Sequence, residues 1–173
     1  MTSTRNTPDL AAVFDAHVTH EFVDKDVNAT MTTMVAEPYV LNVPTATGGE
    51  GQAGVRRFYS EEFVGHMPAD TRVEPISRTV GQNQVVDELI LSFTHDIELI
   101  YMLPGVPPTG KHVELPHVVV VRFEGDKIAH EHIWWDQACL LVQVGLLDPV
   151  KLPAVGAAQA AKLREKAQGI AKP

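Results

Sequence analysis

Histidines and a carboxylate gather in one short segment in the last third of the 173-residue chain. The stretch "AHEHIWWDQ" places His130, His132, Trp134 and Asp136 at alternate positions. In an extended strand these residues share one face, because successive side chains point to opposite sides of the backbone. An acid, an aromatic wall and imidazoles on one face could move a proton to and from a bound molecule.

Asp136 is the first candidate for a general acid or base. That role at neutral pH needs a carboxyl group whose pKa is raised by removal from water, as the wall of an apolar pocket can provide. Counting along the strand does not choose which face points inward. In the alternative, Asp136 caps a helix after the strand, and Ile133 and Trp135 form the core.

Two further strands supply candidate site residues. In "VDELILSFTHDIELIY" the face of Leu89, Leu91 and Phe93, which are expected to be buried, also carries Asp87 and His95. In "HVVVVRF" His117 shares a face with Val119 and Val121 and is expected to point inward with them. The predicted catalytic residues are Asp136, His132 and His95, with either histidine polarising a substrate oxygen. The predicted substrate-binding residues are His117, Trp134, Tyr39, Tyr59, Asp87 and Tyr101.

Other chemistries receive less support from the sequence. The pair His130 and His132 could ligate a metal, but no carboxylate completes a known metal motif, so no metal is expected. Cys139, within "ACLLVQ", is expected to be a small buried hydrophobic residue rather than a nucleophile. The chain has no phosphate-binding glycine loop, no dinucleotide fingerprint and no nucleophile elbow, so no cofactor is expected.

The elements that position these residues begin with helices. Thr7 before Pro8 predicts a helix start, and apolar residues then recur every fourth position at Leu10, Phe14, Val18 and Phe22. A second helix is predicted over residues 24–36, ended by Pro38, and a third over residues 51–66. Between them lie a short strand at residues 39–43 and a predicted loop at residues 45–51.

Extended segments follow the helices. Residues 71–80, 84–102 and 111–125 are rich in β-branched and aromatic residues and are separated by turn sequences. Helices followed by antiparallel strands predict an α+β domain over residues 1–151, with one strongly curved sheet wrapped over the helices. The Ala/Lys-rich tail, residues 152–173, is predicted to be a loosely docked helix or a frayed end.

Composition limits the partners. A net charge of −8 with no basic patch argues against nucleic acids and anionic membrane surfaces. No apolar run approaches the roughly 18 residues of a membrane span. A single cysteine and a polar amino-terminal sequence favour a reducing, cytoplasmic compartment.

The segment "EGDKIAHEHIWWDQACLLVQVGLL", with the earlier "GKHVELPHVVVVRF" and "GGEGQAGVRRFY", resembles the SnoaL-like branch of the nuclear-transport-factor-2-like superfamily over about residues 8–149. The resemblance implies a cone-shaped α+β barrel with an apolar pocket, in dimers packed through the sheet. Asp136 sits where SnoaL-like polyketide cyclases place their acid/base aspartate. Ile133 and Trp135 would then lie outside with Val118 and Val120, as a homodimer surface.

The expected function is that of a small cofactor-free enzyme of the cyclase, isomerase or dehydratase type. It would act by acid–base chemistry next to the carbonyl group of a small hydrophobic molecule. The alternative is a non-catalytic domain of the same fold that binds a small ligand or a partner.

Overall fold

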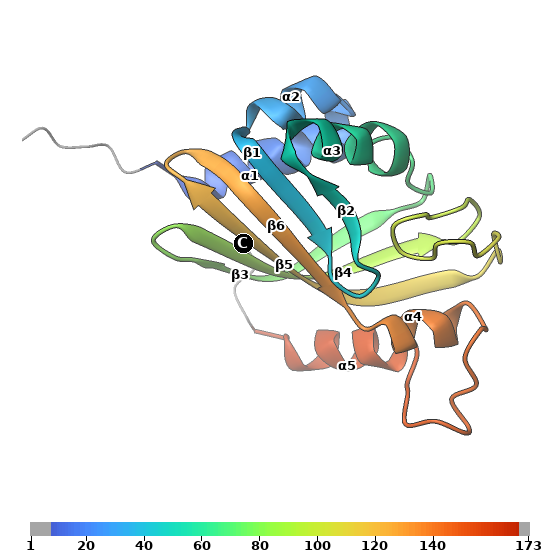
Figure 1. Ribbon diagram of the computed structural model, residues 1–173. Coiled ribbons are helices and arrows are strands. Elements are labelled where there is room, and N and C mark those ends of the chain that lie inside the picture. Colours follow the sequence, from blue (N-terminus) through green and yellow to red (C-terminus); the bar gives the residue numbers. More distant parts are fainter. Residues whose placement is uncertain (1–7, 170–173) are drawn as a thin grey trace, which may run out of the picture.

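The computed structural model describes residues 8–169 and shows an α+β fold built on one curved sheet (Figure 1). The strand order is β2-β1-β6-β5-β4-β3, and neighbouring strands are antiparallel except β1 and β6, which run parallel. The predicted curved, mostly antiparallel sheet is confirmed; over the described residues it stays open at β2 and β3. The strands are β1 (Met34–Asn42), β2 (Thr47–Glu50), β3 (Arg72–Val80), β4 (Gln84–Thr94), β5 (His112–Glu124) and β6 (Lys127–Trp135).

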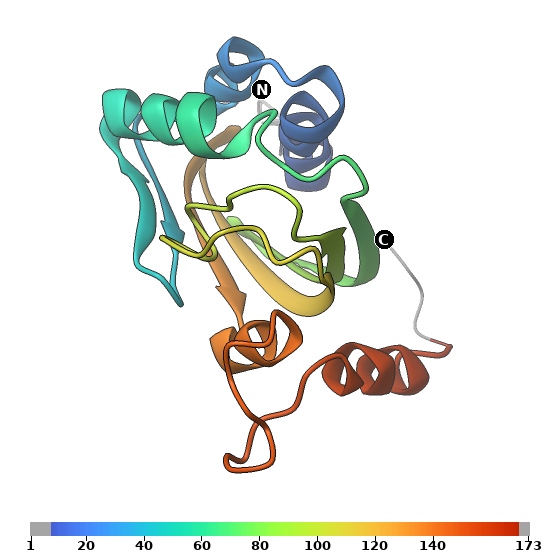
Figure 2. The same ribbon diagram turned by 90° about the vertical axis from the view of Figure 1, so that its right-hand side faces the viewer.

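Helices lie on both sides of the sheet (Figure 2). The concave side is covered by α1 (Leu10–Thr19), α2 (Val27–Thr32) and α3 (Gly51–Phe58), with π-helical turns η1 (His20–Asp24) after α1 and η2 (Tyr59–Phe63) after α3. The end of β6 leads into α4 (Gln137–Gln143), and α5 (Ala158–Lys166) packs on the opposite face. Within residues 8–169, no helix has the length and apolar content to cross a membrane.

The first helix forms where the four-residue repeat predicted it. Leu10 and Phe14 are buried in the main core. Asp9 caps the helix, since its Oδ1 accepts a hydrogen bond from the Ala12 backbone N–H at 3.1 Å. The predicted cap at Thr7 lies outside the described residues.

The predicted second helix was too long. It ends at Thr32, and Met34 already belongs to β1, which continues through Pro38. The threonines before the boundary and Val35 after it are β-branched and favour extended backbone. Pairing of Met34 with Ile128 of β6 then secures the strand.

The predicted loop at residues 45–51 contains β2. Its glycines allow α3 to lie directly on the strand. A Cβ atom added to Gly49 would lie 2.3 Å from the carbonyl oxygen of Gly54, so a side chain there would push the helix away. The prediction failed because glycine was taken as a turn signal, whereas here it permits close backbone packing.

The predicted strand over residues 84–102 stops at Thr94. Residues 95–111 form an irregular loop whose two ends are joined by hydrogen bonds from the His95 N–H to the Lys111 carbonyl and from the Thr109 N–H to the His95 carbonyl. Leu99, Met102 and other apolar residues of the loop are buried. Their hydrophobicity, which suggested a strand, comes from packing of the loop into the core.

The inward faces of β4 and β5 were predicted correctly. Leu91, Phe93 and Val121 are buried, and Leu89 and Val119 pack partly buried against the same core.

The inward face of β6 is the opposite of the predicted one. Trp135 is 8% exposed and Glu131 5%, whereas Trp134 is 48% exposed. Directly opposed residues of an antiparallel pair share a face, and Trp135 and Ile133 oppose the inward His117 and Val119.

A β-bulge between β5 and β6 causes this reversal. Phe123 pairs with Ile128 but Arg122 pairs with His130, so Ala129 is an extra residue in β6. Without it, the hairpin would have paired Val121 with His130 and placed the histidines inside. One extra residue reverses every later side chain, because the side-chain period of a strand is two.

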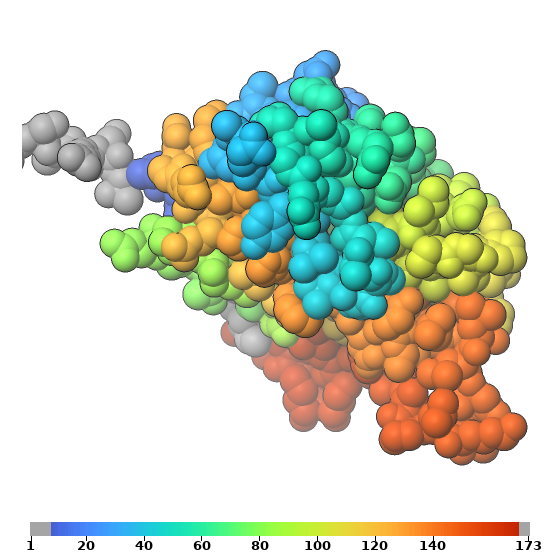
Figure 3. Space-filling model, in the orientation of Figure 1, coloured from blue at the N-terminus to red at the C-terminus, as the bar shows by residue number. Residues whose placement is uncertain are grey.

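The tail segment contains α5, which docks on the outer face of the sheet. Ala160 and Leu163 pack against Ile76 and Ile90. Arg164 pairs with Glu74 of β3 at 2.7 Å and with a carboxylate of β5 at 2.8 Å. In the space-filling view the connection between α4 and α5, residues 144–157, projects from the body (Figure 3).

Two changes in length at the bulge test its role. Deletion of Ala129 preserves the pairing of Arg122 with His130, so we expect this variant to fold with Trp135 still buried. Insertion of one alanine after Ala129 forces either a wider bulge or a reversal of the two faces of β6. We expect this variant to have a free energy of unfolding lower by at least about 3 kcal/mol. Urea denaturation followed by tryptophan fluorescence measures both; equal stabilities would contradict this account.

Candidate active site

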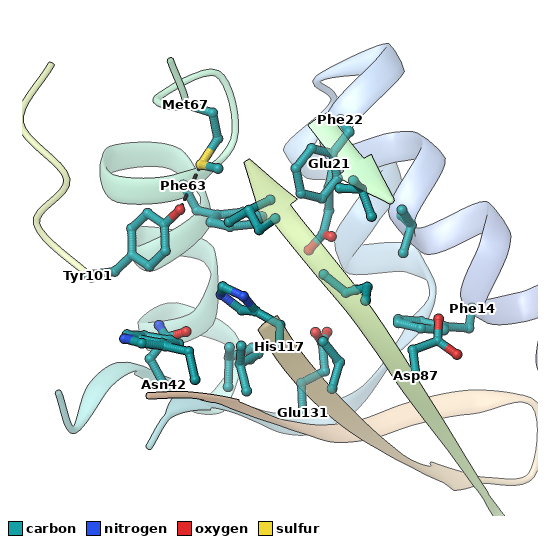
Figure 4. A pocket seen from close by; sticks show the side chains of 18 of the residues that line it. Phe14, Glu21, Phe22, Asn42, Phe63, Met67, Asp87, Tyr101, His117 and Glu131 are labelled. Atoms are coloured by element: carbon teal, nitrogen blue, oxygen red, sulfur yellow. Dashed lines mark hydrogen bonds between the residues drawn. The ribbon is translucent and has the colours of Figure 1, made fainter. Parts of the chain in front are cut away.

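A cavity of about 420 Å³ lies between the concave face of the sheet and the helical segments of the amino-terminal half (Figure 4). Its walls are mainly apolar, with aromatic rings from Phe14, Phe22, Phe58 and Phe63. Few polar groups in an apolar pocket are typical of small-molecule sites. The polar and charged residues lining it are Asp15, Thr19, Glu21, Asn42, Tyr59, Arg78, Asp87, Tyr101, His117 and Glu131.

Four side chains form a buried network at the wall of this cavity. His17 Nε2 lies 3.1 Å from Glu21 Oε1 and 2.9 Å from Glu131 Oε1. The Tyr59 hydroxyl donates to Glu131 Oε1 at 3.0 Å. All four residues are buried, yet Glu21, Tyr59 and Glu131 line the cavity. The network can therefore meet a bound molecule.

Hydrogen bonding fixes the proton on the far side of the His17 ring. The Thr33 hydroxyl donates to the Thr30 carbonyl at 2.6 Å, so its oxygen is left to accept. It lies 2.6 Å from His17 Nδ1, which must therefore carry a hydrogen. His17 Nε2 then faces the two carboxyl groups.

The buried charges shift the pKa values of the network. Burial alone would lower the pKa of His17, but the charges of Glu21 and Glu131 and hydrogen bonds with them raise it to about 10. Burial raises the pKa of Glu21 against the attraction of His17. Burial, with the nearby carboxylates, also raises the pKa of Tyr59, which keeps its hydroxyl a donor. At neutral pH the network holds an imidazolium next to a carboxyl group that retains its proton unusually well.

Both π-helical turns present members of this network. Glu21 lies in η1 and Tyr59 is the first residue of η2. In η2 the Val64 N–H bonds to the Tyr59 carbonyl at 2.8 Å, five residues back. The wider turn changes the direction of the following side chains, and such turns are frequent at functional sites.

The same residues could ligate a metal ion. His17 Nε2 and one oxygen each from Glu21 and Glu131 lie within 4.8 Å of one another. One imidazole and two carboxylates suit a divalent cation such as Zn²⁺ or Mn²⁺. In this structure these atoms contact one another directly.

Four predicted substrate-binding residues do line the cavity: Tyr59, Asp87, Tyr101 and His117. The carboxylate of Asp87 accepts two hydrogen bonds from Arg78, at 2.6 and 2.7 Å, so both of its oxygens are already bonded to that guanidinium. Tyr101 donates its hydroxyl to Met67 Sδ at 2.7 Å.

The prediction that Asp136 faces the pocket was wrong. Its Oδ1 accepts hydrogen bonds from the Ala138 and Cys139 backbone N–H groups at 2.9 and 3.2 Å, so Asp136 is the N-cap of α4. Its side chain also contacts Gln159, and it borders a depression on the outer surface. The capping alternative is the one that the structure shows. Cys139 is buried, as expected.

His132, Tyr39 and Trp134 also lie outside the cavity, on the outer face of the sheet. The Tyr39 hydroxyl lies 3.0 Å from His132 Nε2, and the Tyr39 ring stacks on His130 with centroids 4.6 Å apart. The bulge at Ala129 turns His132 and Trp134 of β6 outward, where Tyr39 of the neighbouring β1 lies beside His132.

His95 is buried but does not line the cavity. It follows β4, and its Nδ1 lies 3.1 Å from the Thr109 hydroxyl. Its Nε2 has no hydrogen-bond partner among residues 8–169. The predicted convergence of His95, His132 and Asp136 therefore does not occur.

Four residues of the cavity and its network were not predicted from the sequence: His17, Glu21, Asn42 and Glu131. The signal for the first two was present, because they continue the buried helix face of Leu10 and Phe14 at helical spacing. A histidine and a glutamate on a core face need partners, which makes them informative. Glu131 shares its strand face with Ile133 and Trp135, so it could have been found only by choosing that face.

The network predicts how stability depends on pH. The pKa of His17 is raised above its unfolded value of 6.5, so its contribution is complete below pH 6.5 and is lost as pH rises toward about 10. We expect the free energy of unfolding to fall across this range by up to about 1.4 kcal/mol per pH unit. Urea denaturation at several pH values measures the slope, which should flatten in His17→Gln; an unchanged slope in that variant would contradict the assignment.

Comparisons with known proteins give the fold and the family. A putative SnoaL-like polyketide cyclase from Jannaschia sp. CCS1 is 16% identical, with a TM-score of 0.63 over 86% of this chain and 100% of that one. AclR, a putative hydroxylase from Streptomyces galilaeus, is 19% identical, with a TM-score of 0.60 over 80% and 97%. A hypothetical protein with a ketosteroid isomerase-like fold from Catenulispora acidiphila DSM 44928, in complex with trimethylamine, is 15% identical, with a TM-score of 0.57 over 82% of this chain and 96% of that one.

These likenesses establish the fold, since all are below 25% identity. No curated protein matches the chain. The sequence model of the SnoaL-like domain matches residues 4–131, more than half of the chain. The protein therefore belongs to the SnoaL-like domain family.

Proposed function

We propose that this protein is an enzyme of the cyclase or isomerase type that moves a proton at a carbon next to a carbonyl group. The observation that carries the proposal is the network of His17, Glu21, Tyr59 and Glu131, which is buried but opens on an apolar cavity. Such chemistry needs a positioned acid or base in a dry pocket. The network supplies the acid and base from the protein's own side chains.

Glu21 is the proton carrier in this proposal. As a carboxylate it takes a proton from the substrate carbon, and the electron pair of the broken C–H bond forms the enolate. Glu21 then returns the proton at another carbon, so the overall reaction needs no oxidant or reductant. Burial raises its pKa, which makes the Glu21 carboxylate a stronger base than an exposed carboxylate.

His17 and Tyr59 act as positioning residues. The imidazolium of His17 lies between Glu21 and Glu131 and limits the repulsion between them. The Tyr59 hydroxyl holds Glu131 in place at 3.0 Å. The similarity to a putative SnoaL-like polyketide cyclase supports the reaction class. The alternative, a ligand-binding domain without catalysis, would use the same cavity without proton transfer.

Hydrogen–deuterium exchange tests the proposal without the natural substrate. Small cyclic ketones such as 1-tetralone are incubated with the protein in D₂O, and NMR follows the loss of the hydrogens next to the carbonyl. We expect the protein to accelerate exchange and Glu21→Gln to reduce that acceleration by roughly 100-fold, the usual scale of positioned acid–base catalysis. Circular dichroism checks that the variant folds.

Asp136→Asn is the matched comparison. Asparagine also caps helices, so this variant should fold and keep its exchange activity. If Asp136→Asn loses exchange activity and Glu21→Gln keeps it, the active site lies at Asp136 on the outer surface and not at Glu21. Ketones that exchange no faster with the protein than without it would favour the binding-domain alternative. If exchange requires an added divalent cation, His17, Glu21 and Glu131 act as metal ligands.

We also propose that the protein is a homodimer through the outer face of the sheet. Val118 is 38% exposed and Trp134 48%, beside the partly buried Val120. Exposed apolar patches of this kind usually mark interfaces. Val118 and Val120 belonged to the expected surface, but Ile133 and Trp135 face the cavity, so Trp134 is the aromatic residue of this patch.

Trp134→Glu tests this assembly. A charge at the centre of the patch should convert the dimer to a monomer and leave the fold intact. Light scattering coupled to size exclusion measures the mass of both proteins. A wild-type monomer at micromolar concentration would refute the dimer.

A further inference from the structure

A second polar position lies in the cavity, apart from the proton-transfer network. It consists of Asn42 on β1 and His117 on β5, which flank β6 on its two sides. Asn42 pairs with Ile133 and His117 pairs with Trp135, two residues farther along β6. The two side chains therefore bracket an apolar floor, and Figure 4 shows both at the cavity wall.

Asn42 offers an unused hydrogen-bond donor. The residue is 3% exposed, and its Nδ2 has no hydrogen-bond partner among the described residues. Buried polar groups are nearly always paired, because an unpaired donor loses its hydrogen bonds to water without replacement. A carbonyl oxygen of a bound molecule would satisfy this donor.

His117 offers the complementary acceptor. Its Nδ1 lies 2.9 Å from the Leu115 carbonyl, which can only accept, so Nδ1 carries the hydrogen. Burial lowers the pKa of His117 to about 4, so the ring is neutral at pH 7. Nε2 is then a lone-pair acceptor on a ring that points into the cavity (Figure 4).

The charges around the cavity favour a neutral ligand. Glu21, Glu131 and Asp87 line it, and the guanidinium of Arg78 is bound by Asp87 and Asp15 at 2.6 to 2.7 Å. Among the described lining residues no cation is free for an anionic group. A carboxylate or phosphate would therefore be repelled.

We infer that Asn42 and His117 form a recognition subsite for a neutral hydroxy-ketone. The Asn42 amide donates to the carbonyl oxygen of the ligand, and the ligand hydroxyl donates to His117 Nε2. The inference rests on the proposed function, since the recognised carbonyl is the one that activates the neighbouring carbon. Holding both oxygens fixes which carbon faces Glu21.

Binding of four related probes tests the subsite without turnover. The set is 6-hydroxy-1-tetralone with both groups, 1-tetralone with the carbonyl alone, the tetrahydronaphthol with the hydroxyl alone, and tetralin with neither. The isomer 7-hydroxy-1-tetralone varies the spacing. For the wild-type protein we expect one hydroxytetralone to bind about tenfold more tightly than each single-group probe, and tetralin to bind most weakly.

Substitutions assign each hydrogen bond to its residue. Asn42→Leu should weaken the binding of the hydroxytetralone and of 1-tetralone about tenfold and leave the affinity for the tetrahydronaphthol unchanged. His117→Phe should weaken the binding of the hydroxytetralone and of the tetrahydronaphthol and leave the affinity for 1-tetralone unchanged. His112→Phe, an exposed histidine at the start of the same strand, is the control and should change none of them.

The probe series on the unaltered protein keeps the test decisive if a variant fails to fold. The subsite is refuted if tetralin and both hydroxytetralones bind with equal affinity. It is also refuted if Asn42→Leu and His117→Phe change the affinity of every probe by the same factor. Glu21→Gln separates this result from the proposed function, because it should reduce the acceleration of exchange by roughly 100-fold but keep the probe affinities. If the probes bind in the expected order but the protein does not accelerate hydrogen–deuterium exchange, the subsite is supported and the proposed enzymatic activity is refuted.

Discussion

Burial of a histidine between two carboxyl groups is the constraint on which the concave side of this protein depends. Removing such ions from water costs several kcal/mol each, so the arrangement persists only with close pairing and hydrogen bonds on every side. Thr33 holds one ring nitrogen of His17, the carboxyl groups of Glu21 and Glu131 face the other, and Tyr59 holds Glu131. These residues come from α1, both π-helical turns, the end of α2 and β6, so one network ties the helices to the sheet.

The same dry surroundings give the two ends of the cavity different chemistry. Burial raises the pKa of the Glu21 carboxyl and lowers that of the His117 imidazole, because in each case it disfavours the charged form. Burial thus makes the Glu21 carboxylate a stronger base than an exposed carboxylate, whereas His117 stays neutral and accepts a hydrogen bond. In one apolar pocket, the Glu21 carboxyl group can act on a bound molecule while the neutral His117 ring orients it. Neither step needs an ion from solution.

Strand β6 presents functional side chains to both faces of the sheet, because successive side chains of a strand point to opposite sides. Toward the cavity it presents Glu131 and Trp135. Toward the outside it presents His130 and His132, whose rings stack 4.7 Å apart beside Tyr39. The titratable residues most conspicuous in the sequence therefore form a surface cluster, while the strand contributes a single carboxylate to the network.

The sequence alone determined the fold class and the inward faces of β4 and β5, because these follow from local periodicity. It also contained the pair His17 and Glu21 on a core helix face. The tertiary structure decided the face of β6, the partners of Asp136 and the meeting of His17 with Glu131. The physical reason is that a strand face depends on register with its neighbour, and one extra residue, Ala129, reverses it without changing the alternation of the sequence.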